Sequence, residues 1–411
     1  MRVAIIGAGI AGVTTAYELA SEGHEVAVFE RRGSVAAEAS FANSGLLAPA
    51  LALPLQAPAW PAPGGQFGWR VQQWKAARRP EAAARADALH HLAVYAHARL
   101  QSLRRALQLD FESAEGLLLL ARTARERDAI APGLARLERL GLAAETLDAA
   151  QCRAREPGLN EQTPLHGGVA LKPAEIGNCR QLAHLLRVEA QRLGARWRFD
   201  TTVRSVAAGG ELVHEHAPMQ ALAGAAAGGR PQDAGDTVPT PLGPQRERFD
   251  AIVVCAGTET AALLAPLGLK LAAYAITSHS LTAPLRQFEA HPDLGPRGAV
   301  VDLHHDVTVS RIGQRVRLVG RDAARLHEVL HDWFPGAIQS GQLQRWSGSH
   351  AQFADHLPVL GKTAVPGLWL HAAASDAGWS VALGAARVIA DGLQGRGAEV
   401  DVAGLGVERF A

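Results

Sequence analysis

Apolar positions in the first 30 residues follow a strand pattern, then a helical one, then a strand pattern again. Residues 3–6 form a short apolar run rich in β-branched side chains, which is typical of a buried parallel strand. A second strand covers residues 25–29 and ends at Glu30. Between the strands, apolar positions recur at about the 3.6-residue period of an amphipathic helix that Gly23 ends; they are Ile10, Val13, Tyr17, Leu19 and Ala20. The pattern predicts a strand–helix–strand unit of a parallel sheet.

The rest of the chain combines helical and alternating patterns. Helical spacing predicts helices over residues 80–109, 122–140, 178–192 and 378–393. Apolar runs predict buried strands over residues 249–257 and 368–373, and shorter strands over 196–199 and 201–206. Four alternating segments joined by Gly and Pro predict an antiparallel sheet; they are 274–282, 299–303, 307–311 and 315–319. We therefore expect an α/β fold in which a Rossmann-type domain is interrupted by an α+β domain with an antiparallel sheet.

Composition narrows the cellular setting. With 411 residues the chain is long enough for two cores, and its net charge of +1, with mixed acids and bases, gives no sign of a nucleic-acid partner. Its three cysteines form no C-x-x-C pair, which fits a reducing compartment. No apolar run reaches the roughly 18 residues of a membrane span. We expect a cytoplasmic protein, and a peripheral association with the inner face of the membrane stays open.

Three glycines after the first strand have the spacing of a dinucleotide-binding turn. Gly7 would allow the tight turn, Gly9 the approach of a pyrophosphate, and Gly12 close packing of helix on strand. Glu30 stands where an acidic side chain meets the ribose hydroxyls and disfavours a 2′-phosphate. The pattern does not separate NAD from FAD. The residues expected to contact the dinucleotide here are Ile6, Gly7, Ala8, Gly9, Ile10, Ala11, Gly12, Glu30 and Arg31.

Small polar residues follow this unit. Ser40, Asn43 and Ser44 could donate hydrogen bonds to phosphate or ring oxygens, and Gly45 would permit close approach. The alternative is a surface loop in which Ser and Asn cap the next turn. From the residues alone the two interpretations are equally good.

Several segments together resemble one family. Residues 40–45, with the sequence Ser-Phe-Ala-Asn-Ser-Gly, follow the strand–helix–strand unit, and residues 115–123, 171–179, 346–348, 355–361 and 378–380 continue the likeness. This set resembles the small-subunit type of D-amino-acid dehydrogenase, an FAD flavoprotein family of the D-amino-acid oxidase superfamily. The resemblance spans nearly the whole chain and implies FAD as the cofactor.

The resemblance also implies a division of the chain and further cofactor contacts. We expect residues 1–50, 166–265 and 345–411 to form the FAD-binding domain, residues 51–165 and 266–344 the substrate domain, and residues 207–248 an irregular insertion. The backbone of Val203 would meet the adenine end, although an ordinary sheet valine is an equal alternative. The other implied contacts are Leu46, the strand end at Ala256 and Gly257, and the N-terminus of the last helix at Gly378, Trp379 and Ser380.

The chain departs from the family pattern in the expected substrate pocket. His350 stands where the family has a carboxylate-binding Arg, His279 replaces a family Tyr, and residues 373–379 lack the family's G-H-G-T-L-G-W sequence. Arg311, Arg317 or Arg321 could supply a replacement Arg, and Arg311 heads our choice. The expected substrate-binding residues are therefore His279, Arg311, His350 and Trp379, each of which could instead be structural. No single catalytic residue is predicted.

The resemblance implies FAD-dependent oxidative deamination of a D-amino acid. The α-hydrogen would pass to the flavin, and the electrons would go on to a quinone, a carrier protein or oxygen. The alternatives are oxidation of glycine, sarcosine or another amine, or a flavin-binding homologue with little catalysis. A metal site at His214 and His216 is not expected, because no carboxylate or cysteine set accompanies them.

Overall fold

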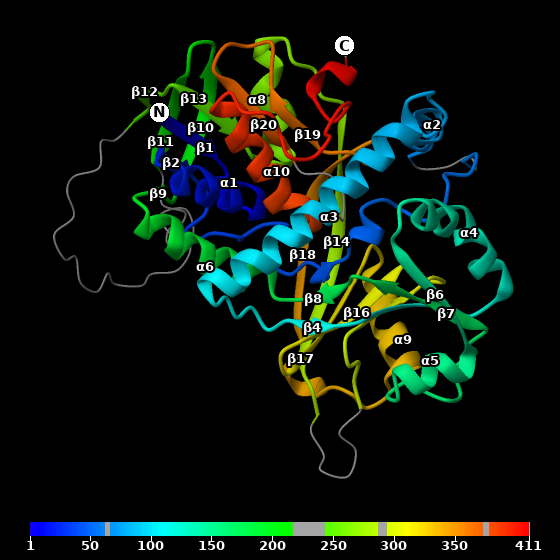
Figure 1. The fold of residues 1–411 in the computed structure, drawn as a ribbon. Helices are drawn as coiled ribbons and strands as arrows, with labels where there is room; N and C mark the ends of the chain where they lie inside the picture. The colour runs from blue at the N-terminus through cyan, green and yellow to red at the C-terminus, as the bar shows by residue number, and fades with distance from the viewer. Residues whose placement is uncertain (62–65, 217–242, 287–293, 373–377, 411) are drawn as a thin grey trace.

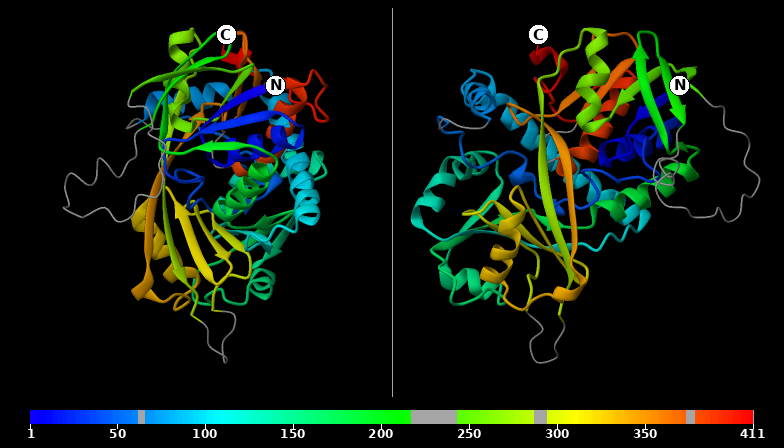
Figure 2. Two further views of the ribbon diagram at one scale, coloured as in Figure 1. Left: turned by 90° about the vertical axis from the view of Figure 1, so that its left-hand side faces the viewer. Right: turned by 180° about the vertical axis from the view of Figure 1, so that it is seen from behind.

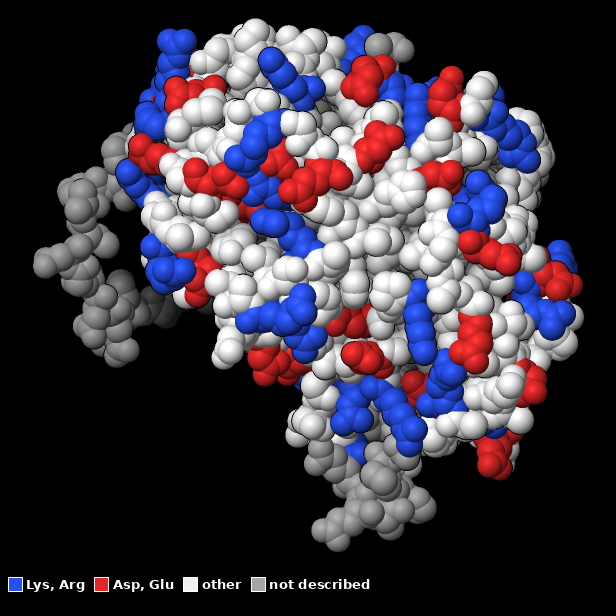
Figure 3. Space-filling model, in the orientation of Figure 1, with Lys and Arg blue, Asp and Glu red and all other residues white. Residues whose placement is uncertain are grey.

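The computed structural model describes residues 1–61, 66–216, 243–286, 294–372 and 378–410. Figure 1 shows two parts, one built on a mainly parallel sheet and the other on a larger sheet. Two long strands, β14 (Ala273–Pro284) and β18 (Gln344–Phe353), run from one part to the other, as Figure 2 shows from two further sides. On the face drawn in Figure 3, positive and negative side chains are interspersed.

The first part is built on a six-stranded sheet with the order β19-β20-β13-β1-β2-β9. Strands β20, β13, β1, β2 and β9 are parallel, and β19 runs antiparallel at the edge. This is the Rossmann-type arrangement predicted from the sequence. The strands are β1 (Arg2–Ile6), β2 (Glu25–Phe29), β9 (Arg196–Arg198), β13 (Ala251–Val254), β19 (Val359–Lys362) and β20 (Leu368–Ala372).

Both faces of this sheet are covered, which explains its continuous apolar runs. Val3 and Ile5 face a core shared with α1 (Ile10–Ser21), α6 (Cys179–Arg192) and α10 (Gly378–Leu393). Ala4 and Ile6 face a second core. That core is closed by a three-stranded antiparallel sheet and a short helix; they are β10 (Thr201–Ala207), β11 (Glu211–His216), β12 (Gln245–Arg248) and α8 (Thr260–Leu264).

The expectation of irregular chain over residues 207–248 is therefore wrong at both ends of that range. Leu212 is fully buried in the second core, and β11 pairs with both β10 and β12. The frequent Gly and Pro residues between these strands mask the short alternating patterns, and β12 is far from its partner β11 in sequence. Residues 217–242, the middle of the range, lie outside the described residues.

The second part contains an eight-stranded sheet with the order β18-β14-β17-β16-β15-β5-β7-β6. Its four predicted strands are all present, but the sheet is mixed rather than purely antiparallel, because β15 pairs with β5 in parallel. The strands not yet given are β5 (Leu117–Ala121), β6 (Ala143–Asp148), β7 (Gly167–Lys172), β15 (Ala299–Asp302), β16 (Val307–Ile312) and β17 (Arg315–Gly320).

Each face of this sheet has its own core. One is closed by α5 (Ala149–Arg155) and α9 (Ala323–Trp333), the other by α4 (Ala124–Arg139) and the chain near residues 48–55. The long helix α3 (Ala82–Leu107) packs against α10. A small sheet is formed by β3 (Leu46–Leu47), β4 (Ala114–Glu115) and β8 (Glu175–Ile176). The remaining elements are the helix α2 (Phe67–Ala76) and the 3-10 helices η1 (Pro49–Leu51), η2 (Gly257–Glu259), η3 (Ala265–Leu267), η4 (Ser340–Gln342) and η5 (Val407–Phe410).

Two strands lie on the other side of the expected division. Both β7 and β18 belong to the eight-stranded sheet, although residues 166–265 and 345–411 were assigned to the FAD-binding domain. The β18 strand pairs with β14 over ten residues, so its position is determined by a non-local pairing that its own sequence does not reveal.

Candidate active site

The three glycines after β1 have different neighbours. A Cβ at Gly7, whose φ is +100°, would lie 2.5 Å from the carbonyl oxygen of Cys255, and one at Gly12 would lie 1.9 Å from that of Gly7. These two glycines are needed for the turn itself and for packing α1 against β1 and β13. A Cβ at Gly9 would approach only Ser40 Oγ, at 3.5 Å. The protein leaves Gly9 open, as the approach of a pyrophosphate requires.

Ser40 and Asn43, in the loop after β2, each accept a hydrogen bond from a backbone N–H group. The backbone N–H of Ile10 donates to Ser40 Oγ at 3.1 Å, so this hydroxyl lies at the N-terminus of α1. The N–H of Gly45 donates to Asn43 Oδ1 at 3.2 Å. Gly45 itself has φ of +77°, and a Cβ there would lie 2.8 Å from the carbonyl oxygen of Gly177. Asn43 thus caps the next turn, as the alternative expects, whereas buried Ser40 contacts the N-terminus of α1 instead. Direct contact of these side chains with a cofactor stays a prediction.

Glu30 lies against the glycine turn. Its carboxylate accepts hydrogen bonds from the N–H groups of Ala8 at 2.7 Å and Arg32 at 2.8 Å. Burial raises the pKa of this carboxyl group above its usual value. Arg31 instead lies near the acids Glu38 at 3.3 Å and Glu259 at 3.4 Å. A fixed, buried carboxylate at this position can accept hydrogen bonds from the hydroxyl groups of a ribose.

The other expected adenine-side residues lie around the same edge. The N–H of Thr201 donates to the carbonyl oxygen of Glu30 at 2.8 Å, which places β10, and with it Val203, beside the end of β2. Ala256 is half-buried at the end of β13, and a Cβ at Gly257 would meet no atom within 4 Å. This open edge, the turn at Gly9 and the carboxylate of Glu30 fit the adenine dinucleotide half of FAD.

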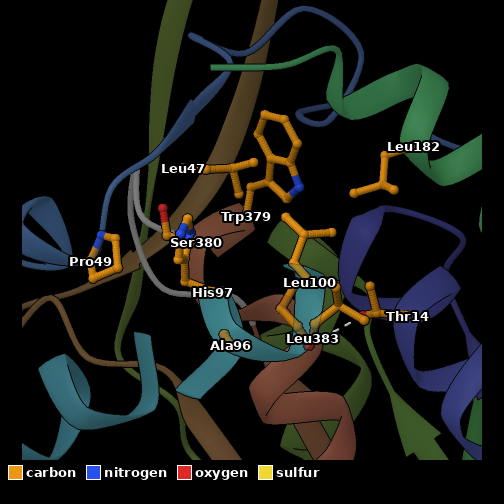
Figure 4. Close-up of a pocket in the computed structure, with 11 residues that line it drawn as sticks. Thr14, Leu47, Pro49, Ala96, His97, Leu100, Leu182, Trp379, Ser380 and Leu383 are labelled. Carbon is orange, nitrogen blue, oxygen red and sulfur yellow. Dashed lines mark hydrogen bonds between the residues drawn. The ribbon is translucent and has the colours of Figure 1, made fainter. Parts of the chain in front are cut away.

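The N-terminus of α10 meets the chain near β3. Ser380 Oγ accepts a hydrogen bond from the N–H of Ala48 at 3.2 Å and lies 3.4 Å from the carbonyl oxygen of Leu46. The neighbouring Trp379 ring points into a small cavity of about 10 Å³ between α1, α3, α6 and α10 (Figure 4). That space is about enough for one water molecule. Trp379 is therefore a core residue, and the expectation that it contacts substrate finds no support in this position.

A much larger cavity lies between these segments and the eight-stranded sheet. Its volume is about 440 Å³, within the range of roughly 300–1,000 Å³ usual for ligand sites. Segments expected to contact the flavin form one wall, and the sheet forms the opposite one. The lining residues are Ser44, Leu46, Ala48, Leu51, Ala52, Leu53, Pro54, Leu55, Gln56, Leu119, Ile130, Ser278, Val301, Leu303, Asp306, Thr308, Val319, Gly320, Arg321, His356 and Ser380.

Successive side chains of a strand point to opposite faces of the sheet, so only some of the expected substrate residues face the cavity. Thr308 lines the cavity, whereas Val307 and Val309 belong to the core on the opposite face. Arg311 shares the parity of these valines and donates from Nε to the carbonyl oxygen of Gly313 at 3.1 Å, so the choice of Arg311 is wrong for this cavity. His279 likewise alternates with the lining residue Ser278 and points away.

His350 lies on the cavity side of the sheet but does not line the cavity itself. It pairs with Ile276, which shares the parity of Ser278. Two residues before it, a Cβ at Gly348 would lie 1.9 Å from the Trp346 ring, which stacks on Phe41 at 5.7 Å. The glycine of the W-x-G sequence is therefore required by an indole that covers it.

Arg317 has a structural position on the cavity side. It donates from Nε to Thr282 Oγ1 at 3.1 Å and from Nη1 to the carbonyl oxygen of Asn43 at 3.2 Å. Burial lowers its pKa to about 10. This side chain fastens the loop after β2 to the sheet. Arg321, the third arginine considered as a replacement for the family Arg, lines the cavity.

Sequence reasoning missed His356. It lines the cavity with a φ of +60°, which is uncommon for a residue other than glycine. Its Nε2 lies 3.0 Å from Gln73 Nε2 of α2 and its Nδ1 lies 3.1 Å from Gln352 Nε2. The strained backbone gives no sequence signal, although the residue falls inside the 355–361 segment that carries the family likeness.

Comparison with known proteins identifies the family. The family profile described as "DAO: FAD dependent oxidoreductase" matches residues 2–392, and the chain belongs to this family. D-amino acid dehydrogenase of Cereibacter sphaeroides (strain ATCC 17023) is 33% identical over 100% of this chain and 96% of its own length, and that of Rhizorhabdus wittichii is 29% identical over 100% of both.

Solved structures agree on the fold. Glycine oxidase from Geobacillus kaustophilus superposes with a TM-score of 0.72 at 21% identity, covering 99% of this chain and 98% of its own. L-proline dehydrogenase from P. horikoshii gives 0.70 at 14% identity, covering 100% and 97%. The chain is thus an FAD-dependent oxidoreductase, and the predicted family, α/β fold class and cofactor are confirmed. Among the described residues, no helix combines the length and apolar character that crossing a membrane requires.

Proposed function

We propose that this protein catalyses the FAD-dependent oxidative deamination of a D-amino acid. The observation that carries the proposal is the 440 Å³ cavity, which lies between the segments expected to hold the flavin and a sheet wall with both apolar and charged side chains. The full-length similarity to D-amino acid dehydrogenases supports the same reaction class.

In this reaction bound FAD supplies a two-electron acceptor for the α-hydrogen and its bonding pair. The amino acid becomes an imino acid, which water converts to a 2-oxo acid and ammonia. The chain's own residues bind and orient the substrate and limit the access of water. The first turn of α10, which reaches the cavity at Ser380, presents the positive end of a helix dipole there.

Arg321 is the proposed substrate carboxylate site. Val319 pairs with Thr308, and Arg321 and Asp306, each two residues beyond this pair along the chain, both line the cavity. An Arg and an Asp on one wall complement the carboxylate and the ammonium group of a zwitterion. This arrangement replaces the Arg that the family has at the position of His350.

A panel experiment tests the proposal. Anaerobic mixing of the FAD-loaded protein with D-amino acids, L-amino acids, glycine and sarcosine should bleach the flavin absorbance with D-amino acids. Bleaching only by glycine or sarcosine would favour the alternative, oxidation of glycine or another amine. Persistent colour with every compound would indicate a flavin-binding homologue with little catalysis. Adding a quinone, a carrier protein or oxygen to the reduced protein then identifies the electron acceptor.

We further propose that the protein works in the cytoplasm and meets the inner face of the membrane through α2. None of the α2 residues is buried, and Trp60 and Phe67 are 60% and 38% exposed. Residues 67–80 contain four cations and no acid; the cations are Arg70, Lys75, Arg78 and Arg79. Exposed aromatic and basic side chains on α2 and on the residues that flank it match an anionic lipid surface.

Vesicle sedimentation tests this surface. The protein should sediment with vesicles that contain anionic lipids and stay free with purely zwitterionic ones. Trp60→Ser and Phe67→Ser should weaken sedimentation without changing flavin content. Val188→Ser, which replaces another exposed apolar side chain, on α6, is the matched control and should have no effect. Equal sedimentation of wild type and of the Trp60 and Phe67 variants would contradict the proposal.

A further inference from the structure

We infer that the substrate of this enzyme carries an aliphatic side chain, which enters an apolar compartment at one end of the large cavity. The inference rests on the proposed deamination and names the class of amino acid that the same site takes. Neither the family nor the similarity to D-amino acid dehydrogenases determines this class. It follows from the order of side chains across the eight-stranded sheet.

One row of side chains crosses the cavity side of the sheet, and four of its members, Val319, Thr308, Val301 and Leu119, line the cavity floor. Ser280 pairs with Val319, Val319 with Thr308, Thr308 with Val301, and Val301 with Leu119. Because paired residues point to the same face, the row crosses five strands on the cavity side. Strands lie about 4.8 Å apart, so the row is about 19 Å long. It begins with a hydroxyl on β14 and ends with Leu119, an aliphatic residue, on β5.

The roof over the β5 end is also aliphatic. Leu55 lines the cavity from the chain between β3 and α2, Ile130 lines it from α4, and both belong to the same apolar core as Leu119. Away from the cavity these side chains are enclosed, since Leu119 and Ile130 are each 1% exposed. Arg321 directly follows β17, and Asp306 lies in the turn that joins β15 to β16, so neither charged side chain comes from β5. The two ends of the cavity therefore differ in polarity.

The roof is held in place by the protein. A Cβ at Gly133 of α4 would lie 2.4 Å from the carbonyl oxygen of Leu55, so this glycine lets the roof segment lie directly on the helix. Arg136 Nη2 donates to the carbonyl oxygen of Pro54 at 3.3 Å. The compartment is a formed site that does not depend on substrate to assemble.

Its chemistry selects among amino acids. A charged side chain would lose its water there without gaining a partner, and glycine would leave the compartment empty. Each methylene buried there should favour binding by about fourfold. Leucine exceeds alanine by three carbons, so D-leucine should exceed D-alanine in kcat/KM by about 50-fold.

Anaerobic stopped-flow measurement of flavin reduction by the FAD-loaded protein tests the inference. The substrate series is glycine, D-alanine, D-2-aminobutyrate, D-norvaline, D-leucine and D-glutamate, and kcat/KM should rise along the aliphatic members and fall sharply for D-glutamate. Val301→Thr introduces a hydroxyl into the compartment and should lower the D-leucine to D-alanine ratio about fivefold. Val300→Thr is the matched control, since Val300 faces the opposite core, and should leave the ratio unchanged.

The outcomes are distinct. Faster reduction by glycine, D-alanine or D-glutamate than by D-leucine would overturn the inference while leaving the proposed deamination intact. An equal effect of the two valine substitutions on the ratio would also overturn it. Reduction by none of the amino acids would refute the proposed function, and this inference with it. Flavin content and thermal unfolding confirm that each variant is folded.

Discussion

Substituting Gly9 with Ala separates the cofactor role of the glycine turn from its role in folding. Gly9 has φ of −65° and ψ of 179°, which any L-residue adopts, and its Cβ would approach only Ser40 Oγ at 3.5 Å. Gly9→Ala should therefore leave the FAD-free protein as stable as before or stabilise it by about 0.4–1 kcal/mol, because it restricts the unfolded chain. The new methyl group would occupy the side on which the pyrophosphate approaches. FAD affinity should fall about 100-fold, which corresponds to about 2.7 kcal/mol.

Gly12→Ala is the matched contrast. Its Cβ would lie 1.9 Å from the backbone oxygen of Gly7, which cannot rotate away, so α1 must shift. This variant should lose about 1–3 kcal/mol of stability even without FAD. Thermal unfolding of the FAD-free proteins measures the first effect, and flavin fluorescence titration measures affinity. Unchanged FAD affinity in Gly9→Ala, or a loss of stability there as large as in Gly12→Ala, would refute this assignment of roles.

Three other substitutions test separate parts of the structure. His371 is buried with Nδ1 2.9 Å from Thr15 Oγ1, and burial lowers its pKa to about 3. Between about pH 6.5 and 3 only the unfolded chain binds a proton at this residue, so acidification from pH 7 to 5 should lower the stability of wild type by about 2 kcal/mol more than that of His371→Asn. Urea unfolding measures the two losses, and equal losses would contradict this. Arg317→Met should lower stability by about 2 kcal/mol and weaken FAD binding, because Arg317 fastens the loop at Asn43 to the sheet. In the flavin fluorescence titration Arg317→Lys should be intermediate, and unchanged FAD affinity of Arg317→Met would contradict this role. Gly348→Ala should displace the Trp346 ring from Phe41 and change tryptophan fluorescence, and an unaltered spectrum would argue against that packing.

The nucleotide-binding unit could be predicted from local sequence because its glycine spacing, apolar period and terminal acid all lie within the first 30 residues. Gly12 is required by the backbone of Gly7 within the unit, whereas the close neighbour of Gly7 is the carbonyl oxygen of Cys255 after β13, a contact that local sequence does not reveal. The apolar period then gives α1 without knowledge of the rest of the chain. For Ser40 the two functions considered were equally good, and the hydrogen bond that it accepts from the N–H of Ile10, 30 residues away, is a contact that neither considered.

The substrate side could not be predicted in the same way, because both faces of the eight-stranded sheet are buried. Arg311 and Arg317 stand on neighbouring strands in similar sequence, and only the register puts Arg317 on the cavity side. A shift of one residue would exchange them. The β7 and β18 strands were misplaced for a related reason, since their partners are distant in sequence. Residues 373–377, which replace part of a family sequence, lie outside the described residues.

The most direct test of the central claim is the absorbance of the FAD-loaded protein after anaerobic mixing with D-leucine and, separately, L-leucine. The account predicts that D-leucine bleaches the flavin band and yields ammonia in proportion to the flavin reduced, while L-leucine leaves the band unchanged. A flavin band that survives D-leucine and every other D-amino acid would contradict it.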